Sequence, residues 1–409
     1  MQTIFTLLPN EAELQKWASV NADNKPLLVN GHFHTPFSFS AFTEIEQVFT
    51  MARNENVRVL GINDFYTTDG YEEFTGLARK YKIFPLYNIE FMALQKDEQA
   101  NNIRVNDPNN PGRTYFSGKG LSFPFKLNEK YQLLLEQVQD ESNIQTSEMV
   151  DKLNVFLFEL GIDIQFTTEE MKARYARNML RERHIAKALR EAVYEKFTTD
   201  NERKTVLSRL FSGKEPKSKL DDFAGLENEI RGNLLKAGGK AFVPENDRAF
   251  LSLEEVRDLI INGGGIPCYP VLLDNPKGEF TDYEGDPEQL YAKLQAKNVS
   301  SLELIPGRNQ FPILKDFVKF FYDKRFVITF GTEHNTPVLE PVKVSCSGGI
   351  ELDEELVQIG YEGACIIAAH QYLVANGKPG YLDENGKAKT AQNKEFVSLG
   401  NALIKYFNS

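Results

Sequence analysis

Apolar runs and helical patterns alternate along the first ninety residues of the chain. Apolar runs that begin at residue 27 and occupy residues 57–62 and 83–89 have the length and composition of buried strands. Between them, residues 43–56 place apolar side chains on one helical face, and residues 69–81 follow a Thr/Asp helix cap. Strands and helices joined by short links are typical of a parallel sheet, so this region predicts an α/β fold.

The alternation stops near residue 97 and resumes near residue 253. Residues 97–125 are rich in Asn, Pro and Gly and predict a long loop. Residues 129–237 have a nearly continuous helical pattern, too long for a crossover between strands, which predicts an inserted helical subdomain. After a helix at 254–262, three further strands are predicted, at 266–270, 299–305 and 326–330. The expected division is a sheet domain from residues 1–128 and 238–345, a helical insertion at 129–237, and a C-terminal helical extension at 346–409.

The composition is that of an ordinary globular protein and limits its partners. The 409 residues carry a formal net charge of −11, which argues against nonspecific binding to nucleic acid or anionic membranes, because both need a basic face. The three cysteines show no zinc-finger or redox spacing. No run has the pattern of a signal peptide or of a membrane span. We therefore expect a cytoplasmic protein with a small anionic substrate, and the C-terminal helices suit packing or a homo-oligomer contact.

A His-x-His pair ends the first predicted strand. Residues two apart on a strand point to the same face, so His32 and His34 are expected to project side by side. Two neutral imidazoles in this arrangement form half of a transition-metal site. The alternative is a pair of polar residues that happens to end a strand. Because two of the chain's five histidines lie here, we favour the metal site.

Further polar residues follow the later strands, where α/β proteins place their chemistry. If the sheet closes into a barrel, they converge with the histidines at one mouth: Asp64, Glu90, Arg308, Glu333, His334 and Asn335. Imidazole and carboxylate ligands suit Zn, Mn or Fe, and such an ion activates water and polarises a phosphoryl oxygen. The expected metal ligands are His32, His34, Glu90, Glu333 and His334.

The remaining candidates are assigned to catalysis and to binding of an anion. Asp64 and Arg308 are the expected catalytic residues, and the forked guanidinium of Arg308 also suits a phosphate group. Three more side chains are expected to contact the substrate, namely Arg113, Lys119 and His184. Structural alternatives stay open: Glu90 paired with Arg308, Asp64 as a turn former, a solvated loop around Arg113 and Lys119, and His184 in a helical core. His370 lies on an apolar helical face and is interpreted as a core residue.

The order and context of these motifs resemble the PHP (polymerase and histidinol phosphatase) superfamily. Its strand-D-x-H-x-H-T-x-x-S-D, T-D-H, G-x-E and G-S-D-x-H motifs are matched by residues 30–39, 63–65, 88–90 and 331–335. Residues 183–189 are similar to the R-P-H-I-A-x-A-L run of the nucleotide-phosphate-cleaving branch, and residues 241–270 resemble its segment leading to A-H-P. The resemblance covers roughly residues 27–340 and implies a distorted (β/α)7, TIM-like barrel with a metal cluster at the carboxyl ends of its strands.

Several positions depart from the family pattern. Phe39, Phe65 and Tyr269 stand where the family has an Asp and two His ligands, and the closing D-x-H is replaced by Glu333 with Asn335. Phenylalanine cannot ligate a metal, so the family's multinuclear cluster is not expected. The remaining side chains suit one divalent ion, or two if Asp64 takes part.

These observations support different functions. The first is a metal-dependent hydrolase, a phosphoesterase for a small phosphorylated metabolite with a reduced metal site, and it is favoured because both histidines and both carboxylates are present. The alternative is a non-catalytic or regulatory ligand-binding protein on a degenerate PHP barrel, which the replaced ligands favour. A third is a lyase or isomerase that uses one metal on a sugar or sugar acid.

Overall fold

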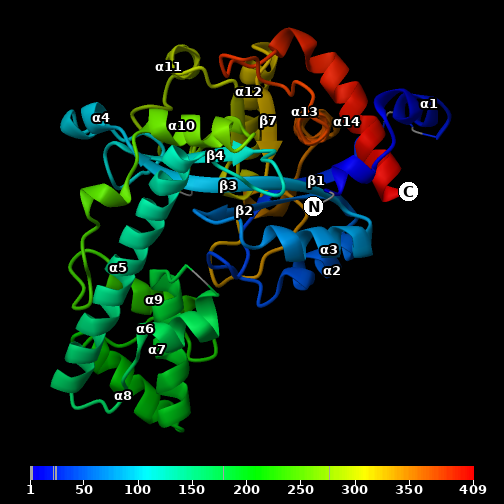
Figure 1. Ribbon diagram of the computed structural model, residues 1–409. Helices are drawn as coiled ribbons and strands as arrows, with labels where there is room; N and C mark the ends of the chain where they lie inside the picture. Colours follow the sequence, from blue (N-terminus) through cyan, green and yellow to red (C-terminus); the bar gives the residue numbers. More distant parts are fainter. Residues whose placement is uncertain (1–2, 22, 24, 178, 276) are drawn as a thin grey trace.

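Seven strands form one sheet that curves into a barrel (Figure 1). The structure is a computed structural model that describes residues 3–21, 23, 25–177, 179–275 and 277–409. The order of strands across the sheet is their order along the chain. They are β1 (Leu28–Phe33), β2 (Val57–Phe65), β3 (Phe84–Leu94), β4 (Arg113–Lys119), β5 (Ile266–Val271), β6 (Ser301–Leu304) and β7 (Val327–Phe330). The expected α/β, TIM-like barrel is therefore confirmed.

The barrel closes where the end of β7 meets the end of β1. Phe33 forms a parallel bridge with Glu333, and the backbone N–H of His34 donates to the carbonyl oxygen of Glu333 at 2.7 Å. Gly331 permits this approach, because a Cβ at that position would lie 2.3 Å from the Cβ of His32. Closure therefore places the last strand's end directly against the His-x-His pair.

Strand β4 lies inside the region that was predicted as a loop, so the prediction of one loop over residues 97–125 is wrong. β4 runs antiparallel to both β3 and β5, whereas all other neighbouring pairs in this sheet are parallel. Its seven residues include only two aromatic side chains, Tyr115 and Phe116, and its buried end carries Ser117 and Lys119. Because polar side chains face the barrel interior here, no apolar alternation marks the strand in the sequence.

Helices cover the outside of the barrel. The layer contains α2 (Ile45–Asn54), α3 (Tyr71–Tyr81), α10 (Leu253–Asn262), α11 (Pro287–Ala296), α12 (Phe311–Asp323) and α13 (Glu354–Ala375). Helix α13 packs on β7 and β1, and a Cβ at Gly363 would lie 1.9 Å from the carbonyl oxygen of Ile328. Outside it lie α14 (Asn393–Asn408) and α1 (Glu11–Asn21). The C-terminal helices thus complete the outer layer beside the point of closure.

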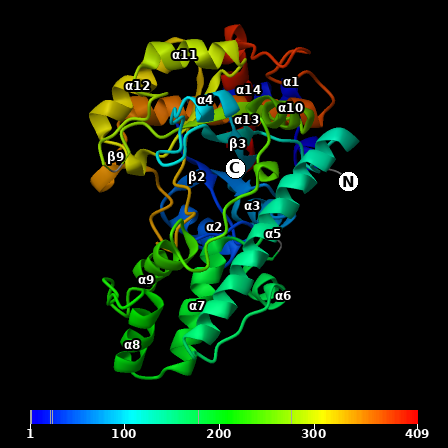
Figure 2. The same ribbon diagram turned by 90° about the vertical axis from the view of Figure 1, so that its left-hand side faces the viewer.

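Most of the segment between β4 and β5, up to the start of α10, forms a helical lobe at one end of the barrel (Figures 1 and 2). Its long first helix, α5 (Glu129–Glu159), runs from the barrel into the lobe. The others are α6 (Thr168–Met171), α7 (Glu182–Lys196), α8 (Asp200–Leu210) and α9 (Phe223–Ile230), with π-helical turns at Lys172–Ala176 and Arg231–Leu235. The lobe has an apolar core of its own, to which Leu153, Leu189, Leu207 and Leu226 contribute. Among the described helices, none combines the length and apolar character that crossing a bilayer requires.

Three short elements lie in the connections between the strands and helices described above. Helix α4 (Lys96–Ala100) lies between β3 and β4, and the strands β8 (Ser345–Cys346) and β9 (Ile350–Glu351) form a small hairpin before α13.

Candidate metal centre

His32, His34 and Glu90 bring three ligand atoms together inside the barrel mouth. The Nε2 atoms of the two histidines lie 3.1 Å apart, and Glu90 Oε2 lies 3.2 Å from His34 Nε2 and 4.0 Å from His32 Nε2. All three side chains are buried. Ligand atoms about 2.0–2.2 Å from a tetrahedral ion are about 3.4 Å from one another, so this spacing fits one transition-metal ion.

Glu90 supplies an oxygen whose hydrogen-bonding capacity is unused. Within the described part of the chain, its Oε2 atom is buried without a hydrogen-bond partner, although His34 Nε2 is close by. Buried polar atoms are nearly always satisfied, and an orphaned one points to a bound ion, a water or a functional role. The donor set of two imidazoles and one carboxylate suits Zn, Mn or Fe. The residues present therefore fit the metal that the sequence predicts.

A second layer of side chains fixes how the two histidine rings are oriented. His32 Nδ1 lies 2.9 Å from Glu303 Oε1. His34 Nδ1 lies 3.1 Å from Ser38 Oγ, which itself donates to Asp64 Oδ1 at 2.6 Å. Since the Ser38 hydrogen is used on Asp64, the hydroxyl accepts from His34 Nδ1–H. Both rings thus engage the second layer through Nδ1 and turn Nε2 towards the shared point.

Burial controls the ionisation of this cluster. It raises the pKa of Glu90 to about 8 and lowers the pKa of His34 to about 4. Burial alone would also raise the pKa of Glu303, but the neighbouring His32 and Lys119 outweigh it and hold the pKa at about 2. Glu303 is therefore charged at neutral pH. Glu90 becomes charged at that pH when a cation lies beside it.

Arg308 and Glu333 form a half-buried ion pair next to the centre. Arg308 Nη1 donates to Glu333 Oε1 at 2.8 Å, its Nη2 contacts Oε2, and Asn335 Nδ2 donates to Oε2 at 2.8 Å. The group of three ligand atoms does not include Glu333. Arg308 already neutralises the carboxylate of Glu333. The structural alternative from the sequence had paired Arg308 with Glu90 instead.

His334, which was an expected metal ligand, lies away from the group and is not one of its three residues. Its Nε2 contacts the carbonyl oxygen of Glu340 at 2.9 Å, its Nδ1 contacts Thr332 Oγ1 at 2.7 Å, and its ring stacks on Phe42. Glu333 and His334 both have left-handed φ angles, of 61° and 54°. This backbone turn sends the imidazole outwards, which spacing along an extended strand does not reveal.

Asp64 and Lys119 make structural contacts, whereas the sequence predicted a catalytic role for Asp64 and a substrate contact for Lys119. Asp64 is buried and accepts from the backbone N–H of Thr35 at 2.7 Å, from Thr35 Oγ1 at 2.5 Å and from Ser38. It therefore holds the loop after β1, as the turn-forming alternative proposed. Lys119 is fully buried inside the barrel, paired with Glu303, and is not among the residues that line the cavity above the centre.

Arg113 and His184 lie at or beside the cavity above the centre. Arg113 lines it, but its guanidinium is paired with Glu245 and packs over the ring of Phe250. His184 is buried behind the wall, where its Nδ1 accepts from the backbone N–H of Arg181 at 3.0 Å. Burial lowers the pKa of His184 to about 3, so it is a neutral residue that fixes the start of α7.

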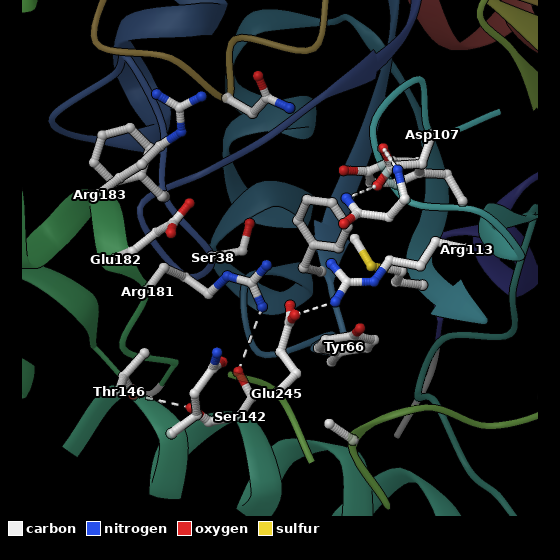
Figure 3. Close-up of a pocket in the computed structure, with 18 of the residues that line it drawn as sticks. Ser38, Tyr66, Asp107, Arg113, Ser142, Thr146, Arg181, Glu182, Arg183 and Glu245 are labelled. Carbon is white, nitrogen blue, oxygen red and sulfur yellow. Dashed lines mark hydrogen bonds and ion pairs between the residues drawn. The ribbon is translucent and has the colours of Figure 1, made fainter. Parts of the chain in front are cut away.

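A cavity of about 370 Å³ separates the barrel mouth from the helical lobe (Figure 3). The barrel contributes Ser38, Phe65, Tyr66 and Tyr115, and the lobe contributes Ser142 and Thr146 from α5 and residues 181–183 from the start of α7. The cations that line it are Arg113, Arg181, Arg183, Arg231 and Lys236. The helical insertion thus covers the mouth and supplies four of these five cations.

Arg181 and Arg183 differ from the other cations in the cavity. Among the described residues, neither forms an ion pair with a carboxylate, whereas Arg231 and Lys236 both pair with Glu182. Arg181 contacts Ser142 Oγ at 3.4 Å and packs over the ring of Phe65 at 4.9 Å. Burial and the nearby Arg231 lower the pKa of Arg183 to about 10. These two guanidinium groups carry uncompensated positive charge into the cavity.

Phe65 forms the floor between the cavity and the metal centre. Its ring stacks on His34, with centroids 5.0 Å apart and planes at 26°, and its other side meets Arg181. Ser38 and Tyr115 complete this floor. The three ligand residues themselves do not line the cavity.

The sequence analysis missed three residues of this region. Glu303 was passed over inside a predicted strand, although a carboxylate in the apolar run Ser301–Leu304 was a visible signal. Arg181 and Arg183 belong to a basic helical stretch whose direction the sequence could not show.

Known proteins share the fold of this chain at low sequence identity. No protein-family model matches the chain, and no curated protein matches it by sequence. A protein from Bifidobacterium adolescentis, assigned as a metal-dependent phosphoesterase, superposes with a TM-score of 0.50 at 18% identity, over 81% of this chain and 94% of its own. An amidohydrolase from Chromobacterium violaceum, solved with sulfate and without metal, gives a TM-score of 0.50 at 16% identity, over 81% and 95%. At this identity the similarity shows a common fold alone.

Proposed function

We propose that the protein is a metal-dependent hydrolase, a phosphoesterase for a small phosphorylated metabolite, with a one-ion centre held by His32, His34 and Glu90. The orphaned Oε2 of Glu90 carries this proposal, because it lies 3.2 and 4.0 Å from two imidazole Nε2 atoms in a buried position. Three lone pairs this close repel one another unless a proton or a cation lies between them. A divalent ion satisfies all three at once.

The ion, when bound, supplies a Lewis acid that activates water and polarises a phosphoryl oxygen. The protein's own residues bind the substrate and position the groups around the centre. Arg181 and Arg183 bind the anionic group of the substrate from the lobe side, with geometry suited to phosphate oxygens. Arg308 orients Glu333, and Asp64 keeps the loop that carries Ser38 in place.

We expect an oxyanion as the ligand. The cavity of this chain has the matching chemistry, since its wall carries two arginines that pair with no carboxylate among the described residues. A volume of about 370 Å³ suits a small metabolite. Because the lobe contributes both arginines, we expect the insertion to select the substrate while the barrel carries out the reaction.

Membership of the PHP superfamily is part of the same proposal. The His-x-His strand, Glu90 and the barrel fold agree with it. Phe39 and Phe65 occupy positions where the family has ligands, and in this structure both contact a histidine ring instead. This supports a centre reduced to one ion.

A ligand-binding protein without turnover is the second candidate, and the position of Phe65 favours it. The ring lies between His34 and the cavity, so a substrate in the cavity does not reach the centre directly unless the floor opens. In that case the lobe and the barrel mouth hold an anion, and the centre has a structural role.

Metal analysis of the purified protein, the His32→Ala variant and a His334→Gln control tests these alternatives. We expect about one equivalent of Zn, Mn or Fe in the parent protein and in the control, and none in His32→Ala. A screen of small phosphate monoesters and diesters should then show turnover that His32→Ala lacks.

The outcomes separate the candidates. Absence of metal from the parent protein, even after incubation with Mn and Zn, would overturn the hydrolase. Bound metal without turnover, together with binding of a phosphorylated metabolite, would favour the ligand-binding protein. Loss of metal from His334→Gln would restore that residue as a ligand.

A further inference from the structure

Glu303 and Lys119 form a buried ion pair directly behind His32. Their residues are 1% and 0% exposed. Lys119 Nζ contacts Glu303 Oε2, and the other carboxylate oxygen lies 2.9 Å from His32 Nδ1. Burying two charges is costly, and replacement of such pairs by apolar residues is often stabilising. A role beyond stability is therefore worth seeking for this pair.

The reversed direction of β4 brings the lysine to this position. Because β4 is antiparallel to β5, Lys119 pairs with Ile266, the first residue of β5. Its side chain extends through the barrel interior to reach Asn63 Oδ1 at 3.3 Å as well as Glu303. This contact also fixes the Asn63 amide, whose nitrogen lies 3.1 and 3.0 Å from the two ring nitrogens of His32.

The contacts of Glu303 determine where His32 carries its proton. Ser117 Oγ donates to Glu303 Oε1 at 3.2 Å, and Lys119 is a donor that cannot accept. A carboxylate that is ionised beside a lysine only accepts, so the hydrogen in its contact with His32 belongs to Nδ1. His32 Nε2 then keeps its lone pair, which faces the Asn63 amide nitrogen at 3.0 Å and His34 Nε2 at 3.1 Å.

We propose that Glu303, held by Lys119, is the positioning residue that fixes the Nδ1–H tautomer of His32 and directs its Nε2 at the metal centre. This inference rests on the proposed function. It assigns the ion pair a task that a buried apolar pair cannot perform. Metal-bound histidines commonly have such an acceptor on the other nitrogen, and its loss typically costs about 10–100-fold in metal affinity.

Two double variants separate the acceptor from the charge. Lys119→Met with Glu303→Gln keeps an oxygen that accepts from His32 but removes both charges. Lys119→Met with Glu303→Leu removes the acceptor as well, and it replaces the pair with apolar residues of similar size so that no charge is left unpaired. Glu284→Gln is the control, because Glu284 is a buried carboxylate that contacts Tyr269 and backbone N–H groups of the β5–α11 loop and not His32.

The ring nitrogens of His32 are observed by NMR in metal-free protein labelled with ¹⁵N-histidine, a simple spectrum because the chain has five histidines. Affinity for Zn²⁺ and Co²⁺ is measured by competition with a chelator. We expect the Nδ1–H tautomer in the parent protein, in Glu284→Gln and in the Gln double variant. In the Leu double variant we expect a mixture of tautomers and metal affinity about 10–100-fold weaker.

An unchanged tautomer and unchanged metal affinity in the Leu double variant would overturn the inference, as would an Nε2–H tautomer in the parent protein. If the parent protein binds neither ion, the proposed function fails, whereas the ring spectra still decide whether Glu303 sets the tautomer. Loss of affinity in Glu284→Gln as well would show a general effect of buried carboxylates and would also overturn it.

Discussion

The barrel interior and the cavity above it differ in which charged or polar groups lack a partner. In the barrel, two cations beside the centre are each paired with a carboxylate, as Lys119 is with Glu303 and Arg308 is with Glu333. The group left over is an acceptor, the Oε2 atom of Glu90. In the cavity, Glu182 and Glu245 are paired with cations, and Asp107 accepts from Asn109 and Asn110. Among the described residues that line it, the cations without a carboxylate partner are Arg181 and Arg183.

This difference gives each layer a ligand of its own. Unused lone pairs below require a cation, and unpaired guanidinium groups above require an anion. The two layers belong to different parts of the chain, since the lone pairs come from barrel strands and the guanidinium groups from the insertion. A metal centre with an anionic substrate above it satisfies both layers, and neither layer alone indicates a reaction.

The largest effect is expected from Glu90→Gln, which removes the only anionic ligand of the group of three. We expect metal affinity to fall by more than about 100-fold, beyond the 10–100-fold typical of second-layer changes. The metal-free protein should unfold at the same temperature as the parent, because Gln resembles the protonated form that the raised pKa of Glu90 favours.

Chelator competition and thermal unfolding measure these two quantities, and Glu284→Gln is again the matched control. Retention of metal by Glu90→Gln would show that the orphaned oxygen is not a ligand, and the contrast between the layers would disappear.

The next effect is expected in the cavity from Arg181→Ala. A hydrogen bond to a charged group contributes about 1.5–3 kcal/mol, so binding of sulfate or phosphate should weaken by roughly 10- to 150-fold. Lys236→Ala is the control, because Lys236 shares Glu182 with Arg231 and its loss leaves that carboxylate paired. We expect a smaller loss there. Calorimetric titration compares the two, and equal losses would mean that net charge, and not the unpaired guanidinium, holds the anion.

A third effect concerns histidines whose two nitrogens are both engaged. His370 contacts the carbonyl oxygen of Gly264 through Nε2 at 2.6 Å and accepts from the backbone N–H of Tyr381 at 2.9 Å, and burial lowers its pKa to about 4. A pKa below the unfolded value of about 6.5 stabilises the fold above pH 6.5, and this stability is lost as the pH falls towards 4. The loss is about 1.4 kcal/mol per pH unit.

Denaturant unfolding between pH 7 and pH 4.5 measures this effect. We expect His370→Gln to show a flatter profile than the parent protein and unchanged metal binding, which separates a histidine in the outer layer from the two ligands in the barrel. An identical pH profile in variant and parent would contradict the lowered pKa of His370.

The sequence predicted the features that long apolar runs and fixed spacing record. Six of the seven barrel strands, the helices between them and the convergence of His32, His34 and Glu90 follow from such patterns. The sequence did not predict β4, because its inner face carries Ser117 and Lys119 and these polar residues break the apolar alternation. His334 was misplaced because its left-handed backbone reverses the direction expected from strand spacing.

Residues that act through distant partners were also beyond the reach of the sequence. The role proposed for Glu303 depends on its ion pair with Lys119, which is 184 residues away along the chain. The insertion was predicted as helical, but nothing in its pattern showed that it covers the mouth. Pairing across a closed barrel is a property of the fold, so local patterns contain no record of it.

The smallest effect, a kinetic one, is expected from Phe65→Ala, which removes the ring between the two layers. If Phe65 is the barrier, a chelator should remove the metal faster from the variant, while the affinity at equilibrium changes little because Phe65 donates no ligand. Phe39→Ala is the control, since Phe39 lines the same cavity but contacts His184 and not His34. Stopped-flow mixing with a coloured chelator gives both rates. Equal rates in the parent protein and Phe65→Ala would mean that the ion exchanges by another route, and the two layers would then be separate sites and not one.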